Sequence, residues 1–89
     1  MAERKSGYKI KIRHKAEKEL YKIPFPWQKR IIQAIDVLKS NSSYGEKMWG
    51  KLKDHRKIRV WPYRIIYRIY PRQKIIYVEH IAHRQGVYK

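Results

Sequence analysis

The sequence has no cysteine and no long apolar run. Without cysteine there can be no disulfide framework and no thiolate chemistry, which fits a cytoplasmic location. No stretch is long and apolar enough to span a bilayer, and residues 1–6 carry charges but lack the apolar core of a signal peptide. The sequence therefore predicts a cytoplasmic protein with no membrane-spanning segment.

Motifs of common enzyme chemistry are also absent. The seven carboxylates are spread thinly, and no pair has a spacing that suggests acid–base catalysis. There is no P-loop and no dinucleotide-binding fingerprint, and the histidines do not show the spacing of metal ligands. We expect the histidines to be structural or to lie at the surface; they are His14, His55, His80 and His83.

Positive charge is the dominant feature that is present. The 89 residues include 23 Lys and Arg against 7 Asp and Glu, a formal net charge of +16. This charge predicts a polyanionic partner, which could be a nucleic acid, an anionic membrane surface or an acidic protein. Because 43% of the residues are hydrophobic and periodically placed, we expect one folded domain over 1–89, with a flexible polar start at 1–6.

The first half of the chain shows one strand pattern followed by two helix patterns. Alternation of apolar residues with lysines predicts a strand at 8–13, and helical spacing predicts helices at 15–22 and 27–40. Pro24 and Pro26 are expected to end the first helix and force a sharp connection. Residues 46–54 show no decisive pattern, and we expect Met48, Trp49 and Leu52 to attach this segment to the domain.

The second half alternates with the period of strands. Residues 56–70 predict a β-hairpin with its turn at Trp61-Pro62, and 74–82 predict a third consecutive strand. The apolar run 75–78 suggests that this strand is buried on both sides or nearly so. The order β-α-α-β-β-β predicts an α+β fold, in which a helical hairpin packs on one face of a mainly antiparallel four-stranded sheet.

The hairpin separates its residues onto two faces. Ile58, Val60 and Ile65 belong to an apolar face, while the opposite face carries Lys57, Arg59, Arg64 and Arg68. Like charges on neighbouring strands repel, and a sheet tolerates them more readily if it holds an anion; the alternative is a solvated basic face. Aromatic residues among these cations could stack on bases, although Trp61 and Tyr63 could equally be turn or core residues.

Several segments resemble the RelE toxins of the RelE/ParE superfamily of type II toxin–antitoxin systems, and together they cover roughly residues 8–88. The resemblance rests on Ala16-Glu17-Lys18-Glu19-Leu20, an apolar second helix, Lys51-Leu52, Lys57-Ile58-Arg59-Val60, Tyr63-Arg64-Ile65-Ile66-Tyr67 and His83-Arg84 with Val87-Tyr88. It implies a ribosome-dependent endoribonuclease that cuts mRNA in the A site by attack of the RNA 2′-OH, without a metal or other cofactor. It also implies an acidic, RelB-like antitoxin, and binding of operator DNA only by the toxin–antitoxin complex.

The resemblance also assigns roles to individual residues. The implied catalytic residues are Lys57, Arg59, Arg64, Arg84 and Tyr88, with His83 as a possible additional acid or base. RNA contacts are expected from Lys51, Lys53, Arg68 and Trp61. Arg59 stands where lysine is usual in the family, so it can stabilise charge but cannot act as a base. Lys57 is the best candidate for the base, because neighbouring positive charges disfavour its charged form.

Two other functions are compatible with the same fold. One is a ParE-like toxin that binds gyrase and is not itself an enzyme, although such relatives generally lack the clustered basic residues. The other is a catalytically weak relative that only binds RNA or the ribosome.

Overall fold

The structure, a computed structural model, describes residues 7–83. Its strands are β1 (Lys9–Ile12), β2 (Glu46–Lys47), β3 (His55–Val60), β4 (Tyr63–Tyr70) and β5 (Ile75–His83). Its helices are α1 (His14–Tyr21), α2 (Phe25–Val37) and the short 3-10 turn η1 (Gly50–Leu52). The expected flexible start at 1–6 and the site residues Arg84 and Tyr88 lie outside the described residues.

Both helices form where helical spacing of apolar residues predicts them, but the boundary between them differs from the prediction. Pro24 caps the start of α2 and Pro26 lies in its first turn, so Pro26 belongs to the second helix and does not help to end the first. Proline fits there because the first backbone N–H groups of a helix have no intrahelical partner. Within residues 7–83, neither helix is long and apolar enough to cross a membrane.

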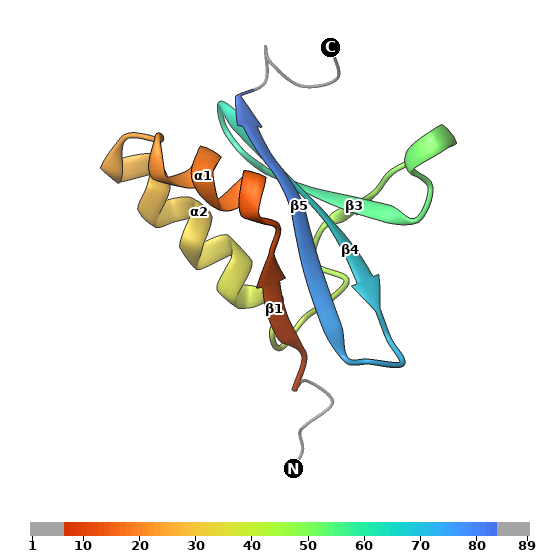
Figure 1. Cartoon of the computed structure of the whole chain (residues 1–89). Coiled ribbons are helices and arrows are strands. Elements are labelled where there is room, and N and C mark those ends of the chain that lie inside the picture. Colours follow the sequence, from red (N-terminus) through yellow and green to blue (C-terminus); the bar gives the residue numbers. More distant parts are fainter. Residues whose placement is uncertain (1–6, 84–89) are drawn as a thin grey trace.

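The helices lie together on one side of the sheet, and the core fills the space between (Figure 1). The packing alternates as the sequence predicts, with the apolar sides of β1, β3, β4 and β5 facing the helices. The buried cluster consists of Ala16, Leu20, Ile23, Ile31, Ile35, Leu38, Ile58, Ile65, Tyr67, Ile76, Val78 and Ile81. Helices on one side of a largely antiparallel sheet are the predicted α+β arrangement, which is thereby confirmed.

The sheet contains one strand more than expected. In the described part of the chain, five strands follow the order β1-β5-β4-β3-β2, with β1 parallel to β5 and the other neighbours antiparallel. The additional strand is β2, whose two residues pair with β3. A strand of two polar residues has no periodicity, so the sequence alone could not reveal it.

Strand β5 is buried more completely on one side than on the other. Ile76, Val78 and Ile81 are fully buried against the helices, whereas Ile75 and Tyr77 are only half-buried. The expectation of burial on both sides was therefore too strong, because the helices cover only one side of the sheet (Figure 1). The uncovered side is the one on which the candidate site lies.

Candidate nucleic-acid interface

Strand pairing gathers the basic residues of the hairpin on the uncovered side of the sheet. Arg59 lies directly opposite Arg64, and Lys57 lies opposite Ile66 in the same register. Arg68 lies opposite His55 at the other end of the pair. We call this group, Lys57, Arg59, Arg64 and Arg68, the basic face. The alternation predicted that these four residues share one side, and the register confirms that placement.

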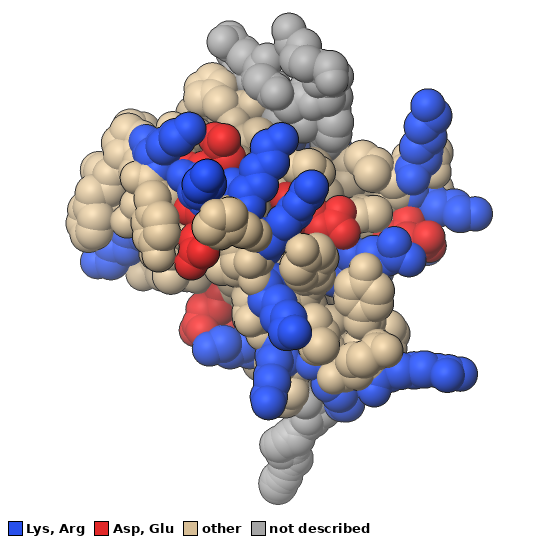
Figure 2. Space-filling model, in the orientation of Figure 1, with Lys and Arg blue, Asp and Glu red and all other residues tan. Residues whose placement is uncertain are grey.

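On the face drawn in Figure 2, Lys and Arg side chains are spread over much of the surface, with acidic groups between some of them. On the basic face the side chain of Arg59 is 60% exposed, whereas Lys57 and Arg64 are half-buried. Two guanidinium groups opposite each other on adjacent strands repel, which destabilises the strand pairing. An anion bound between them removes this repulsion. The face can therefore hold a phosphate group.

Two carboxylates reach the basic face, and sequence reasoning missed both. Glu46 lies opposite Lys57 on β2, and its Oε1 atom is 3.8 Å from Nε of Arg59. Asp54 Oδ2 is 3.8 Å from an Nη2 atom of Arg68. At this distance and exposure each pair contributes little to stability. Both carboxylates come from the segment 46–54 that carried no periodic signal, so only the strand pairing reveals them.

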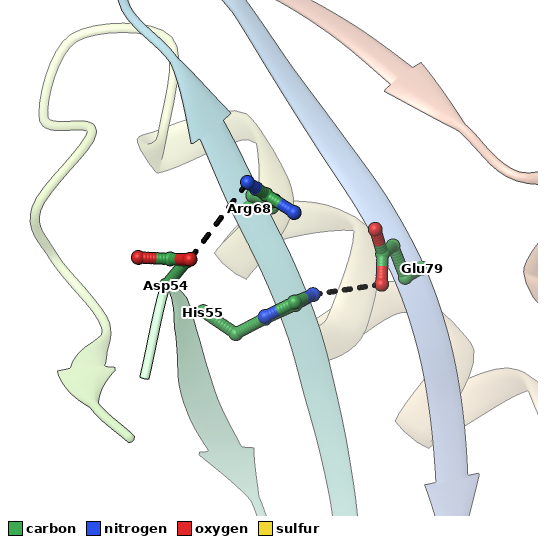
Figure 3. A network of polar contacts seen from close by, with 4 residues as sticks. All are labelled: Asp54, His55, Arg68 and Glu79. Atoms are coloured by element: carbon green, nitrogen blue, oxygen red, sulfur yellow. Dashed lines mark hydrogen bonds and ion pairs between the residues drawn. The ribbon is translucent and has the colours of Figure 1, made fainter. Parts of the chain in front are cut away.

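A buried polar pair lies on the same side of the sheet (Figure 3). His55 Nε2 is 2.9 Å from Oε1 of Glu79, and His55 is only 9% exposed. The strand pairing passes from Ile66 opposite His80 to Tyr67 opposite Val78, which leaves Glu79 in a β-bulge. A bulge redirects a side chain, and here the carboxylate of β5 reaches across β4 to β3. Among residues 7–83, no group of three His, Cys, Asp or Glu side chains is placed to hold a metal.

The environment of this pair also affects the neighbouring His80. Partial burial lowers the pKa of His80 below its usual value, and the positive charges of Arg13 and Lys15 lower it further. The carboxylate of Glu79 acts in the opposite direction. These effects together favour the neutral form of His80 over the protonated form.

A loop anchor positions β2, and with it Glu46, beside the basic face. The buried Tyr67 hydroxyl donates to the Ser42 carbonyl and accepts from the Gly45 N–H, both at 2.8 Å. Arg56 donates to the Gly45 carbonyl at 2.7 Å. A Cβ atom on Gly45 would lie 2.7 Å from the Tyr67 ring and hydroxyl, so this position requires glycine. Burial raises the pKa of Tyr67, partly offset by the bond from Gly45 and the charge of Arg56.

The structure describes four further site residues predicted from the sequence, namely Lys51, Lys53, Trp61 and His83. His83 stacks edge-to-face on Tyr63, with ring centroids 5.4 Å apart, and Tyr63 packs against the core on the helix side. His83 therefore lies on the side opposite Arg64. Trp61 is in the hairpin turn and is 67% exposed.

Lys51 and Lys53 are exposed in the connection between β2 and β3, beyond the edge of the sheet. In the same connection, the expectation that Trp49 attaches to the domain was wrong, because its side chain is 77% exposed. Met48 and Leu52 are half-buried there, as expected of anchoring residues.

The fold is similar to that of several RelE structures. A chain of the toxin–antitoxin complex RelBE2 from Mycobacterium tuberculosis matches with a TM-score of 0.79 and 19% identity, over 86% of this chain and 98% of that chain. A chain of the archaeal RelE–RelB complex from Pyrococcus horikoshii matches with a TM-score of 0.72 and 22% identity, over 92% of this chain and 99% of that chain. The isolated Escherichia coli RelE toxin matches with a TM-score of 0.72 and 22% identity, over 85% and 83%. The protein thus has a RelE-like fold.

Sequence comparison goes further than the shared fold. Residues 10–88 match the family described as "ParE toxin of type II toxin-antitoxin system, parDE". The match spans most of the chain, so the protein belongs to this family of toxins. The resemblance to the RelE/ParE superfamily is thereby confirmed. No curated protein matches the sequence.

Proposed function

We propose that the protein is a ribosome-dependent endoribonuclease that cuts mRNA in the ribosomal A site and so inhibits translation. The observation that carries this proposal is the opposition of Arg59 and Arg64 on the uncovered side of the sheet, with Lys57 on the same face. This arrangement favours a phosphate ligand. Membership of a toxin family supports a role in arresting growth. As part of the proposal, a ribosomal target makes the cytoplasm the site of action.

In the proposed reaction, the 2′-oxygen of one nucleotide attacks the adjacent phosphorus, and the bond from phosphorus to the 5′-oxygen of the next nucleotide breaks. A base accepts the 2′-OH proton and an acid protonates the leaving 5′-oxygen. The products are a 2′,3′-cyclic phosphate and a 5′-OH end. Arg59 and Arg64 stabilise the negative charge that develops on the phosphate oxygens, because fixed positive groups act where charge accumulates.

Lys57 is the proposed base, since it lies on the same face as the two arginines that would hold the phosphate. By resemblance to the RelE family, Arg84 contributes a further charge, and Tyr88 stacks on the scissile nucleotide and assists proton transfer. The carboxylate of Glu46 offsets part of the Arg59 charge in the free protein, and the RNA phosphate replaces it. Lys57→Ala should reduce cleavage far more than ribosome binding, and an equal loss of both would make Lys57 a binding residue.

We also propose that an acidic, RelB-like antitoxin neutralises the protein, and that operator DNA is bound only by the complex of the two. The formal charge of +16 favours such a partner, and similar folds occur in RelB–RelE complexes. A short, largely acidic chain would wrap the domain and cover the basic face.

The decisive test is primer-extension mapping of reporter mRNA in a translating extract. New 5′ ends within A-site codons are expected with the wild type, and none without ribosomes. The variant Arg64→Ala/Arg84→Ala should lose these ends. The charge-matched control Lys29→Ala/Arg30→Ala, in the exposed part of α2, should retain them. Intact mRNA with normal protein output would refute the proposal and favour a relative that only binds RNA or the ribosome.

Inhibition of gyrase is the second candidate, because the matching family is described by the name ParE. A supercoiling assay with purified gyrase distinguishes the two functions. Loss of supercoiling with intact mRNA would assign the protein to the gyrase-directed toxins, whereas unimpaired supercoiling with A-site cleavage would exclude them.

A further inference from the structure

The connection between β2 and β3 carries a strongly exposed aromatic ring among lysines. We call residues 47–53, which comprise the last residue of β2 and most of this connection, the arm. Trp49 is 77% exposed, the highest value among the exposed large hydrophobic residues of 7–83. A single exposed apolar residue needs no special explanation, but the Nζ atom of Lys47 lies 5.6 Å from the centroid of this ring. The arm thus presents an aromatic surface paired with a cation.

The positive charges of the arm are not neutralised by neighbouring acids. The arm contains Lys47, Lys51 and Lys53 and no Asp or Glu. The flanking carboxylates of Glu46 and Asp54 are directed toward Arg59 and Arg68 of the basic face. Among the described residues, no carboxylate lies within ion-pair distance of the three arm lysines. An anionic partner can therefore bind them without first displacing an internal counter-ion.

The arm is ordered and adjoins the basic face. A backbone hydrogen bond from the Met48 N–H to the His55 carbonyl joins the arm to β3, and one from the Lys53 N–H to the Gly50 carbonyl closes the turn within the arm, both at 3.1 Å. Gly50 has φ +70°, which permits the sharp turn at the tip. In β2, Glu46 lies opposite Lys57 of the basic face, and Lys47, the first residue of the arm, follows it and lies opposite Arg56. Figure 1 shows η1 standing away from the sheet beyond β3, and Figure 2 shows basic side chains projecting at that corner.

We propose that the arm binds an unpaired stretch of the RNA strand that the basic face holds, outside the nucleotide that is cut. Trp49 stacks on a base of this stretch, and the arm lysines contact its phosphates. The inference rests on the proposed ribonuclease function and extends its substrate contacts. Single-stranded RNA fits because its bases are free to stack on aromatic rings while its phosphates meet lysines. Continuity of the arm with the basic face favours one strand over two separate RNAs.

The proposal is tested by binding of fluorescent oligouridylates of two lengths, U12 and U3, at low salt. U12 can reach both the basic face and the arm, whereas U3 can occupy only one of them. Trp49→Ala should weaken U12 binding by about 5- to 10-fold, the lower end of what one base-stacking contact contributes. Trp49→Phe, which keeps an aromatic ring, should recover most of this loss. The control Tyr21→Ala removes a ring that is 69% exposed on α1 and should leave binding unchanged.

The lysines of the arm have a separate signature. Lys51→Ala/Lys53→Ala should lower the salt dependence of U12 binding by about 1.4 log units per decade, if each lysine contacts one phosphate. The charge-matched pair Lys29→Ala/Arg30→Ala on α2 should not change the slope. U3 binds mainly at the basic face, so its affinity should be insensitive to the arm variants.

The binding and cleavage experiments together distinguish failure of the arm proposal from failure of the proposed ribonuclease function. Trp49-dependent U12 binding without A-site cleavage by the wild type would sustain RNA binding by the arm and remove the nuclease assignment. A-site cleavage together with unchanged U12 binding by Trp49→Ala would overturn the arm proposal alone. Failure of the wild type to bind U12 would also overturn it. So would an effect of Trp49→Ala that is confined to ribosomal RNA or to a protein partner.

Discussion

Removing the Tyr67 hydroxyl should loosen the segment that brings β2 and Glu46 to the basic face. In the folded protein this hydroxyl makes two hydrogen bonds of 2.8 Å, one from the Gly45 N–H and one to the Ser42 carbonyl. Tyr67 has 0% relative exposure and Gly45 is buried, so water does not readily replace the lost partner. In Tyr67→Phe both backbone groups lose their partner while the aromatic ring keeps its place in the core.

The expected loss of stability follows from these two groups. A buried polar group left without a partner costs about 1–3 kcal/mol. The Gly45 N–H should bear most of this cost, because Ser42 is only half-buried and its carbonyl can be hydrated. We expect the free energy of unfolding to fall by about 2–3 kcal/mol in total, which for a domain of this size corresponds to a melting temperature lower by about 10–20 °C.

Urea-induced unfolding of wild type and Tyr67→Phe measures this difference. The control Tyr21→Phe removes a hydroxyl from an exposed ring and should change stability by no more than about 0.5 kcal/mol. A loss in Tyr67→Phe as small as that of the control would refute the reasoning.

Alkaline pH provides a second signature of the same group. Because the pKa of Tyr67 is raised in the folded protein, its stabilising effect is complete below the unfolded value near 10 and decreases as the pH rises through the folded pKa. The stability difference between wild type and Tyr67→Phe should therefore shrink above pH 10.

Three further predictions concern the neighbouring groups. Gly45→Ala should lower the free energy of unfolding in urea by about 1–3 kcal/mol or more, because the new Cβ overlaps the Tyr67 ring. An unchanged free energy of unfolding would show that the loop can move aside. NMR titration of His80 should give a pKa below 6.5, so the free energy of unfolding should decrease as the pH falls from 6.5 through the folded pKa. In Glu79→Gln the pKa of His80 should be lower still, since the Glu79 carboxylate raises it. A His80 pKa at or above 6.5 would contradict the burial argument. Glu79→Ala should lower the free energy of unfolding by about 1–3 kcal/mol, measured by thermal unfolding, because it leaves Nε2 of the buried His55 without its partner. A change near zero would show that water replaces the carboxylate.

The sequence by itself determined the main elements and the shared side of the basic residues. Apolar residues recur about every 3.6 residues in the helices and every 2 residues in the strands. These periods are local properties of the sequence, so they can be recognised without knowing the fold. The turn at Trp61-Pro62 was also predicted from the sequence, but the structure decides the register of the hairpin, in which Arg59 lies opposite Arg64. Helix and strand order then predicted helices on one side of a mainly antiparallel sheet.

Only the tertiary structure decided which other groups reach that side. Glu46 joins it through a strand of two residues, and Glu79 reaches His55 from a bulge two strands away. The partners of Tyr67 lie 22 and 25 positions away in the sequence. These contacts depend on strand pairing and loop paths between distant residues, which leave no periodic trace in the sequence. The same holds for the exposure of Trp49: its apolar character suggested burial, but the arm extends beyond the sheet edge, where the core cannot cover it.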